Sequence, residues 1–335
     1  MSGGTPSGPV AGLLLRRVGL VLGLALGLAA GVALVAYIYV YGPGPAEERE
    51  RAAPDVMDEE AIRLPAAAEE VIRIGWTAWA DAEVATQIAA QLLERELGLD
   101  VELVMADIGV QYQAVAAGDL DAMLMAWLPM THAEYWRRVR DRVVNLGPIY
   151  YGRLGWVVPD FIPPEELSSI EDLRRPEIGR NIGSQIQGID PGSGLMQASE
   201  QAMRAYELDR LELVAASGAA MTAVLDRAVR RGEWVVVTGW EPHWKFARYD
   251  LRFLDDPQGV LGGRERIHVL VRQGFEDDFP PEVTDFLARL HLTQEDLAEL
   301  LLESQERPVE AVVADYLEAH PRRVRYWLTG VLEEE

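Results

Sequence analysis

The chain has 335 residues, 49% of them hydrophobic, which is enough for two or three domains with buried cores. Its formal net charge of -23 argues against nucleic acid as a partner, because nucleic acids bind basic surfaces. The absence of cysteine excludes disulfides, thiol chemistry, thiolate metal sites and attachment of a lipid to an N-terminal cysteine.

The basic residues are unusual in kind. Of the 31 Lys and Arg residues, one is a lysine, Lys245, and the others are arginines. A surplus of acid keeps proteins soluble by self-repulsion, a device used at high salt. The composition therefore suggests a salt-adapted host, although a coding bias toward arginine accounts for it equally well.

A membrane anchor is the first element expected along the chain. Residues 18–41 carry no charge and follow Arg16 and Arg17. At about 1.5 Å per residue, this stretch covers the roughly 30 Å hydrocarbon core with some tilt. The positive-inside rule then predicts a cytoplasmic tail over residues 1–17 and a single-pass anchor in the inner membrane. A cleaved signal peptide is the alternative, but its apolar region is shorter, about 7–15 residues.

A linker and then a regular alternation of strands and helices follow the anchor. Residues 42–70 are rich in Pro, Ala and Glu, which predicts a solvated linker. Apolar runs predict strands at 71–76, 100–106, 121–127, 153–159, 180–186, 211–216, 233–240 and 266–273. Helical spacing predicts helices at 81–97 (with Asp81 as its N-cap), 108–118, 131–143, 170–175, 194–208 and 218–232, and over the last fifty residues. This order predicts two α/β lobes with mostly parallel, helix-covered sheets, joined by crossing strands.

Three tryptophans lie at or just beyond the carboxyl ends of expected strands. They are Trp79 in "GWTAWADAEV", Trp127 in "LMAWLPMTH" and Trp240 in "VVVTGWEPHW". Ligands of parallel α/β sheets bind at this edge, and the three residues come from both lobes. Aromatic faces attract a quaternary ammonium ion, whose methyl groups prevent hydrogen bonding. A single tryptophan at such a place is more often a core residue, as we expect for Trp136, Trp156, Trp234 and Trp327.

The stretch "QGIDPGSGLM" has the features of an anion site. Gly188, Gly192 and Gly194 surround the start of an expected helix, where free N–H groups attract negative charge. His132, five residues after Trp127, is a possible additional donor. A glycine-rich helix start with no ligand explains this stretch equally well by itself. Together with the aromatic residues, it fits a small zwitterion that has a methylated ammonium and a carboxylate.

The motifs resemble the glycine betaine/proline betaine substrate-binding proteins of ABC importers. The resemblance covers about residues 71–328 and rests on "AWLPMTH", "GIDPGSGLMQ", "AAMTAVLDRA" and "VVVTGWEPHWKFARYDLRFLDDP". It implies a periplasmic-binding-protein-like (type II) fold that closes on its ligand, with 71–158 and 264–335 as lobe I and 159–263 as lobe II. It also implies delivery of the ligand to an ABC permease and its ATPase, with the soluble domain in the periplasm, no enzymatic activity, no cofactor and no metal.

The resemblance also assigns individual residues. It implies that Trp79, Trp127 and Trp240 form the aromatic cage and that Trp76 packs beside it. The ligand carboxylate is expected to bind the backbone N–H groups of Gly188 and Ile189 and the side chain of His132. A choline-specific branch of the superfamily has a fourth aromatic residue where this chain has Leu154, which argues against choline as the preferred ligand.

Two other classes of function remain to be compared with transport. A hydrolase using His132, Asp190 and Ser193 has little support, because the sequence contains neither a nucleophile elbow nor an H-E-x-x-H metal motif. A receptor domain that reports osmolyte level is the other alternative. The tail of 17 residues is too short to hold an output domain, which weakens that interpretation.

Overall fold

The computed structural model describes residues 71–332. The cytoplasmic tail, anchor and linker predicted over residues 1–17, 18–41 and 42–70 lie outside this range. No helix within residues 71–332 is long and apolar enough to cross a membrane.

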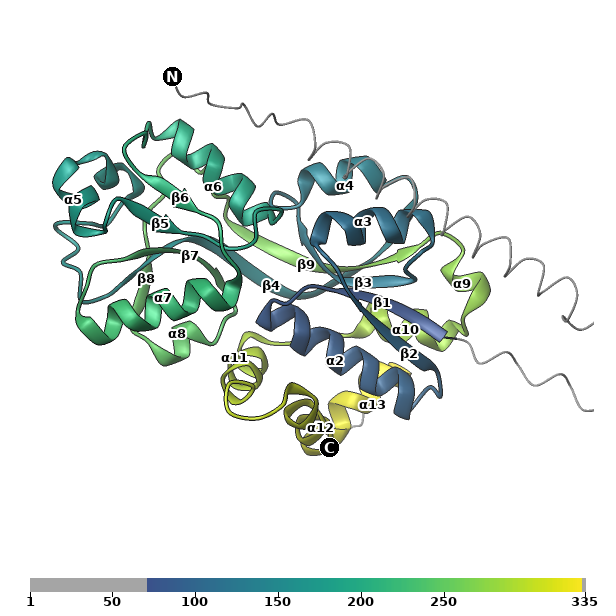
Figure 1. Cartoon of the computed structure of the whole chain (residues 1–335). Coiled ribbons are helices and arrows are strands. Elements are labelled where there is room, and N and C mark those ends of the chain that lie inside the picture. The colour runs from purple at the N-terminus through teal and green to yellow at the C-terminus, as the bar shows by residue number, and fades with distance from the viewer. Residues whose placement is uncertain (1–70, 333–335) are drawn as a thin grey trace, which may run out of the picture. The chain divides into compact units, whose positions relative to one another are not determined.

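A mixed sheet of nine strands forms the centre of the described part of the chain (Figure 1). The strands are β1 (Val71–Trp76), β2 (Asp100–Met105), β3 (Ala122–Leu128), β4 (Val143–Pro159), β5 (Gln185–Gln187), β6 (Glu212–Val214), β7 (Val236–Glu241), β8 (Leu251–Phe253) and β9 (Arg264–Arg272). Their order across the sheet is β2-β1-β3-β9-β4-β7-β5-β6, and β8 pairs with β4.

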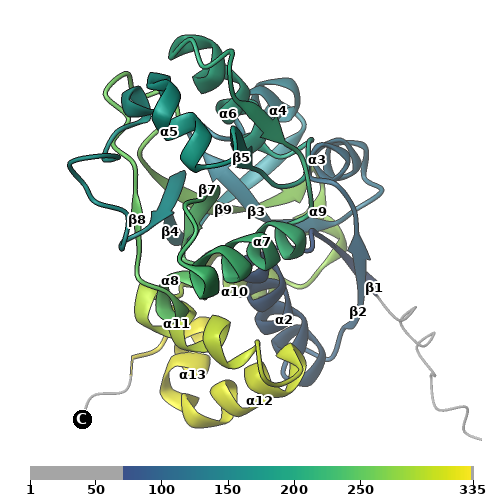
Figure 2. The same cartoon turned by 60° about the vertical axis from the view of Figure 1, so that its left-hand side comes forward.

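The helices cover both faces of this sheet. They are α2 (Ala80–Arg95), α3 (Ile108–Ala117), α4 (Ala133–Val139), α5 (Pro176–Asn181), α6 (Gly194–Ala205), α7 (Gly218–Arg231), α8 (Lys245–Arg248), α9 (Phe275–Asp278), α10 (Pro281–Arg289), α11 (Gln294–Glu303), α12 (Val309–Ala319) and α13 (Pro321–Thr329), with a 3-10 helix at Ile170–Arg174. Around β1–β3, α3 and α4 lie on one face and α2 on the other (Figure 1). The turned view shows α11 and α12 beside α2, which they contact (Figure 2).

The strands form two groups that β4 and β9 connect. Strand β1 is parallel to β2 and β3, and β5 is parallel to β6 and β7. Strand β9 is antiparallel to β3 and to β4. The second half of β4, from Arg153 onward, is antiparallel to β7. The fold is therefore a two-lobed α/β fold with the expected crossing strands.

Several local expectations need correction. Helix α2 begins at Ala80 with Trp79 at its N-cap position, so Asp81 is not the cap but a buried residue of the first turn. Strand β4 begins ten residues before the expected Arg153, because Gly147 and Pro148, which normally indicate a loop, lie here in a strand with irregular register. Residues 180 and 181, expected in a strand, end helix α5, and the short strand β8 was not expected.

Candidate ligand-binding site

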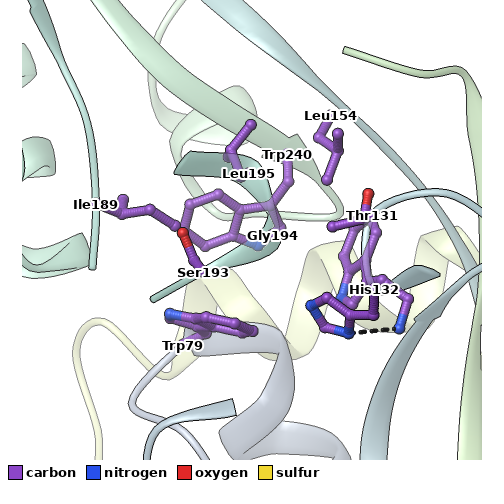
Figure 3. A pocket seen from close by; sticks show the side chains of 10 residues that line it. Trp79, Thr131, His132, Leu154, Ile189, Ser193, Gly194, Leu195 and Trp240 are labelled. Atoms are coloured by element: carbon purple, nitrogen blue, oxygen red, sulfur yellow. Dashed lines mark hydrogen bonds between the residues drawn. The ribbon is translucent and has the colours of Figure 1, made fainter. Parts of the chain in front are cut away.

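A cavity lies where the two groups of strands face each other. The space between its walls, including open solvent at its mouth, is about 300 Å³. Its lining comes from both lobes (Figure 3). The lining residues are Trp79, Trp127, Thr131, His132, Leu154, Ile189, Ser193, Gly194, Leu195 and Trp240.

The three tryptophans are held by different elements, at the carboxyl ends of strands that run in opposite directions in the two strand groups. Trp79 lies three residues beyond β1 and precedes α2, Trp127 is the penultimate residue of β3, and Trp240 is the penultimate residue of β7. All three side chains are at least nine-tenths buried. The structure thus brings together the residues that the sequence placed at strand ends, in agreement with ligand binding at the carboxyl ends of strands in α/β sheets.

Each indole N–H is satisfied by the protein, so the aromatic faces remain for the cavity. Trp79 Nε1 donates to Asp190 Oδ2 at 3.1 Å, and Trp240 Nε1 donates to Asp81 Oδ1 at 2.9 Å. Trp127 Nε1 lies 3.2 Å from the sulfur of Met125. A ligand in this cavity consequently meets ring surfaces rather than N–H donors.

The Trp127 ring also depends on a glycine of β4. A Cβ atom added at Gly152 would overlap the six-membered ring of Trp127 and would lie 2.9 Å from Ile267 Cδ1. A larger residue at position 152 would therefore displace this wall of the cavity.

His132 contributes a neutral imidazole to the cavity. Its Nδ1 accepts a hydrogen bond from the backbone N–H of Trp127 at 3.1 Å, the bond drawn dashed in Figure 3. We therefore assign the ring proton to Nε2. Burial lowers the pKa of His132 to about 3, so the side chain is uncharged near neutral pH and acts as a hydrogen-bond donor through Nε2.

The loop between β5 and α6 supplies backbone donors on the opposite side. Among the described residues, none accepts a hydrogen bond from the Ile189 N–H. Helix α6 begins at Gly194, and Ser193 caps it by accepting from the Met196 N–H at 3.2 Å. The first N–H groups of a helix have no partner within it, so this end of the cavity attracts negative charge.

Gly188 is placed differently from the other predicted residues. It does not line the cavity, and its N–H donates to the Val214 carbonyl at 2.8 Å, continuing the pairing of β5 with β6. Of the six predicted ligand-binding residues, the structure brings five to the cavity and leaves the N–H of Gly188 engaged elsewhere.

Sequence reasoning missed two groups of residues at this site. Thr131 and Leu195 line the cavity without any distinguishing pattern. Asp81 and Asp190 support the tryptophans, and each belongs to the lobe opposite its indole partner. The contact pairs are separated by more than 100 positions, and no spacing rule for helices or strands links such distant residues.

The residues considered for a hydrolase have other partners. Ser193 Oγ accepts the helix-capping bond, Asp190 accepts from Trp79, and His132 Nδ1 accepts from the chain at Trp127. Within residues 71–332, no group of three or more His, Asp or Glu side chains is placed to hold a metal ion.

Comparison with known proteins identifies the kind of site. Residues 70–319 match the model of the substrate-binding domain of the ABC-type glycine betaine transport system. A curated relative, the glycine betaine/carnitine transport binding protein GbuC of Listeria monocytogenes, is 40% identical over 159 residues, which are 46% of this chain and 52% of that protein. The chain thus spans about half the length of this curated relative.

Two solved structures agree in fold. Lactococcal OpuAC, in its closed conformation complexed with glycine betaine, is 34% identical, with a TM-score of 0.71 over 78% of this chain and 100% of that one. The glycine/betaine/L-proline-binding protein ProX of Borrelia burgdorferi is 30% identical, with a TM-score of 0.73 over 77% of this chain and 97% of that one. This is a family of transport substrate-binding domains and not of enzymes. The chain belongs to the family of substrate-binding domains of ABC-type glycine betaine transport systems.

Proposed function

We propose that this protein is the extracytoplasmic substrate-binding component of an ABC importer. The protein captures glycine betaine, or a related quaternary ammonium osmoprotectant, between its lobes. It delivers this ligand to the permease of the importer, and the ATPase subunit of the importer powers transport. One observation carries this proposal: three buried tryptophans line a cavity that also contains a neutral histidine and a free backbone N–H.

The cationic end of the ligand binds Trp79, Trp127 and Trp240. A trimethylammonium group has no hydrogen to donate, so an aromatic face is its best partner, contributing about 0.5–2 kcal/mol per ring. Because the protein already satisfies the indole N–H groups, the cage offers only ring faces to such a group. Hydrated ammonium groups would lose water without gaining hydrogen bonds there.

The carboxylate end binds His132 Nε2 and the N–H of Ile189. Both are donors on the cavity wall, and a carboxylate accepts from both without a change in the protonation of either. The Gly188 N–H, expected as a third donor, is held by Val214, so we leave it out of the proposed set.

The proposed arrangement of the chain extends the sequence interpretation. Lobe I comprises 71–158 and 264–335, and lobe II comprises 159–263. The change of β4 from β9 to β7 as its partner near Arg153 supports a boundary in this strand. Residues 18–41 anchor the protein in the inner membrane, with residues 1–17 in the cytoplasm and 42–70 as the linker to the periplasmic domain. Carbonate extraction of membranes tests the anchor, and a mature form that starts after residue 41 would refute it.

A titration followed by tryptophan fluorescence tests the function. We expect glycine betaine to change the emission and to bind at least about tenfold more tightly than choline. Choline leaves the buried carboxylate donors poorly matched, at a cost of about 1–3 kcal/mol. Carnitine and proline complete the series, and His132→Ala should narrow the difference between betaine and choline. If none of these ligands binds, the proposal fails; choline binding as tightly as betaine would reject the carboxylate site.

A further inference from the structure

The chain's single lysine lies directly against the cage. Lys245 begins α8 and is completely buried. Its Nζ is 4.1 Å from the ring centroid of Trp240 and 5.2 Å from that of Phe246. This Nζ has no hydrogen-bond partner among the described residues. A buried amine without a hydrogen bond is costly, so its position against Trp240 requires an explanation.

Trp240 separates this amine from the ligand cavity. Trp240 lines the cavity, whereas Lys245 does not and is inaccessible to solvent. An amine 4.1 Å above the cavity-facing side of the ring would itself form part of the lining. Nζ therefore lies over the face of the indole that is turned away from the cavity, and the ligand meets the other face.

The titratable groups around Lys245 come from three segments. Asp81 of α2 and Glu241 at the end of β7 favour its protonated form, and His243 lies in the loop before α8. Burial lowers the pKa of Lys245 well below its usual range despite these two carboxylates. Burial also raises the pKa of Asp81 and lowers the pKa of His243 well below its usual value.

We propose that Lys245 determines the affinity of the cage for a cation by acting through Trp240, and that capture of a quaternary ammonium ion expels the proton from its amino group into solvent. This inference rests on the proposed function. An ammonium on each face of one indole would compete for the same π electrons and repel each other. With the neutral amine behind it, the ring presents its full negative face to the ligand.

The size of the effect follows from the geometry. Two cations on opposite faces of the ring are on the order of 9 Å apart, which corresponds to roughly a tenfold or greater loss of affinity at an effective dielectric of about 20. The carboxylate of Asp81 accepts the Trp240 N–H at 2.9 Å, and in its ionised form it strengthens the attraction of the cage for a cation. Binding thus selects the neutral form of Lys245.

Calorimetry on the purified full-length chain tests the proposal. Betaine is titrated from roughly pH 5 to pH 10 in pairs of buffers that differ in ionisation enthalpy, which counts the protons released. We expect release in a window of this range and weaker binding on the acidic side of the window. Lys245→Met, which keeps the length but cannot be charged, should release no proton and should bind at least about tenfold more tightly than wild type at the acidic end. The two proteins should converge at high pH.

Controls separate an electrostatic role from a structural one. Arg248→Met removes a cation from the exposed end of the same short helix and should keep the wild-type proton count. The analogue 3,3-dimethylbutanoate, which keeps the carboxylate but has an uncharged tert-butyl group in place of trimethylammonium, should bind wild type without release of the Lys245 proton. Should Lys245→Met fail to fold, the proton count of the wild-type protein decides by itself. Betaine binding without proton release at any pH, or identical counts in wild type and Lys245→Met, would overturn the inference; absence of betaine binding would instead reject the proposed function.

Discussion

The indole N–H of Trp240 donates a 2.9 Å hydrogen bond to Asp81, a buried carboxylate 159 positions earlier in the chain. The other carboxylate oxygen accepts from the hydroxyl of Tyr150 at 2.8 Å. The cage has a reciprocal contact, because Trp79 Nε1 donates to Asp190 at 3.1 Å. Each strand group therefore supplies a tryptophan to the cage and a carboxylate that orients the other group's tryptophan. The two hydrogen bonds therefore orient the cage and join the two lobes at the same place.

Removal of the Asp190 carboxylate should speed the loss of ligand. Asp190→Ala leaves Trp79 Nε1 without its acceptor, and hydrogen bonds to charged groups contribute about 1.5–3 kcal/mol. We expect dissociation of betaine to be about ten times faster or more, with a smaller effect for Asp190→Asn, which keeps an acceptor. Stopped-flow fluorescence measures the rate. The exposed Asp209→Ala serves as the control, and equal rates for Asp190→Ala and Asp209→Ala would contradict the contact's role.

The cage tryptophans should be sensitive to loss of the aromatic face. Trp127→Ala and Trp240→Ala should each weaken betaine binding about tenfold or more, because a desolvated ring contributes about 1–2 kcal/mol. Substitution by Phe should cost less, since a π face survives. Trp136→Ala, on α4 and outside the cavity lining, should bind nearly as wild type does. Isothermal titration checks all of these variants, and equal losses for Ala and Phe would indicate packing instead.

Close approach of the two lobes should depend on Gly194. A Cβ atom there would overlap the Thr131 carbonyl oxygen and lie 2.9 Å from His132 Cδ2, so Gly194→Ala holds α6 away from the other lobe. We expect at least about a tenfold loss of betaine affinity, equivalent to about 1.4 kcal/mol, with little change in thermal stability of the unliganded protein.

The neighbouring Gly192 offers a matched control for Gly194. A Cβ atom at Gly192 has no atom within 4 Å, so Gly192→Ala should bind betaine as wild type does. Both affinities are measured by titration. Retention of full affinity by Gly194→Ala would show that the lobes can close without this contact.

The neutral state of His132 should make stability depend on pH. Its pKa is about 3 in the folded protein against 6.5 in the unfolded chain, so between these values the unfolded chain binds more protons. The contribution of neutral His132 to the free energy of unfolding is fully present above about pH 6.5. It is lost as the pH falls toward 3, by about 1.4 kcal/mol per pH unit.

A variant that cannot titrate isolates this effect. His132→Asn offers an oxygen to the Trp127 N–H but takes up no proton in this range. Relative to this variant, the wild type should lose about 2 kcal/mol between pH 7.5 and pH 5, measured by urea unfolding without ligand. A difference in the free energy of unfolding that stays constant over this range would be inconsistent with a buried neutral histidine.

Much of the architecture followed from local pattern. Apolar runs such as "VIRIGW" and the helical spacing after Asp81 indicated alternating strands and helices, and the structure confirms both with shifted ends. The positions of Trp79, Trp127 and Trp240 at strand ends in both lobes were enough to predict a shared site, because ligands of α/β sheets bind at the carboxyl ends of strands.

The sequence by itself thus determined which elements form and that the aromatic residues lie at the carboxyl ends of strands, since these depend on near neighbours along the chain. The tertiary structure alone decided that Asp81 orients Trp240 instead of capping a helix and that the Gly188 N–H pairs with Val214. It also placed Lys245 behind Trp240. These contacts join residues of different elements, and their energies depend on burial and orientation, which no local spacing encodes.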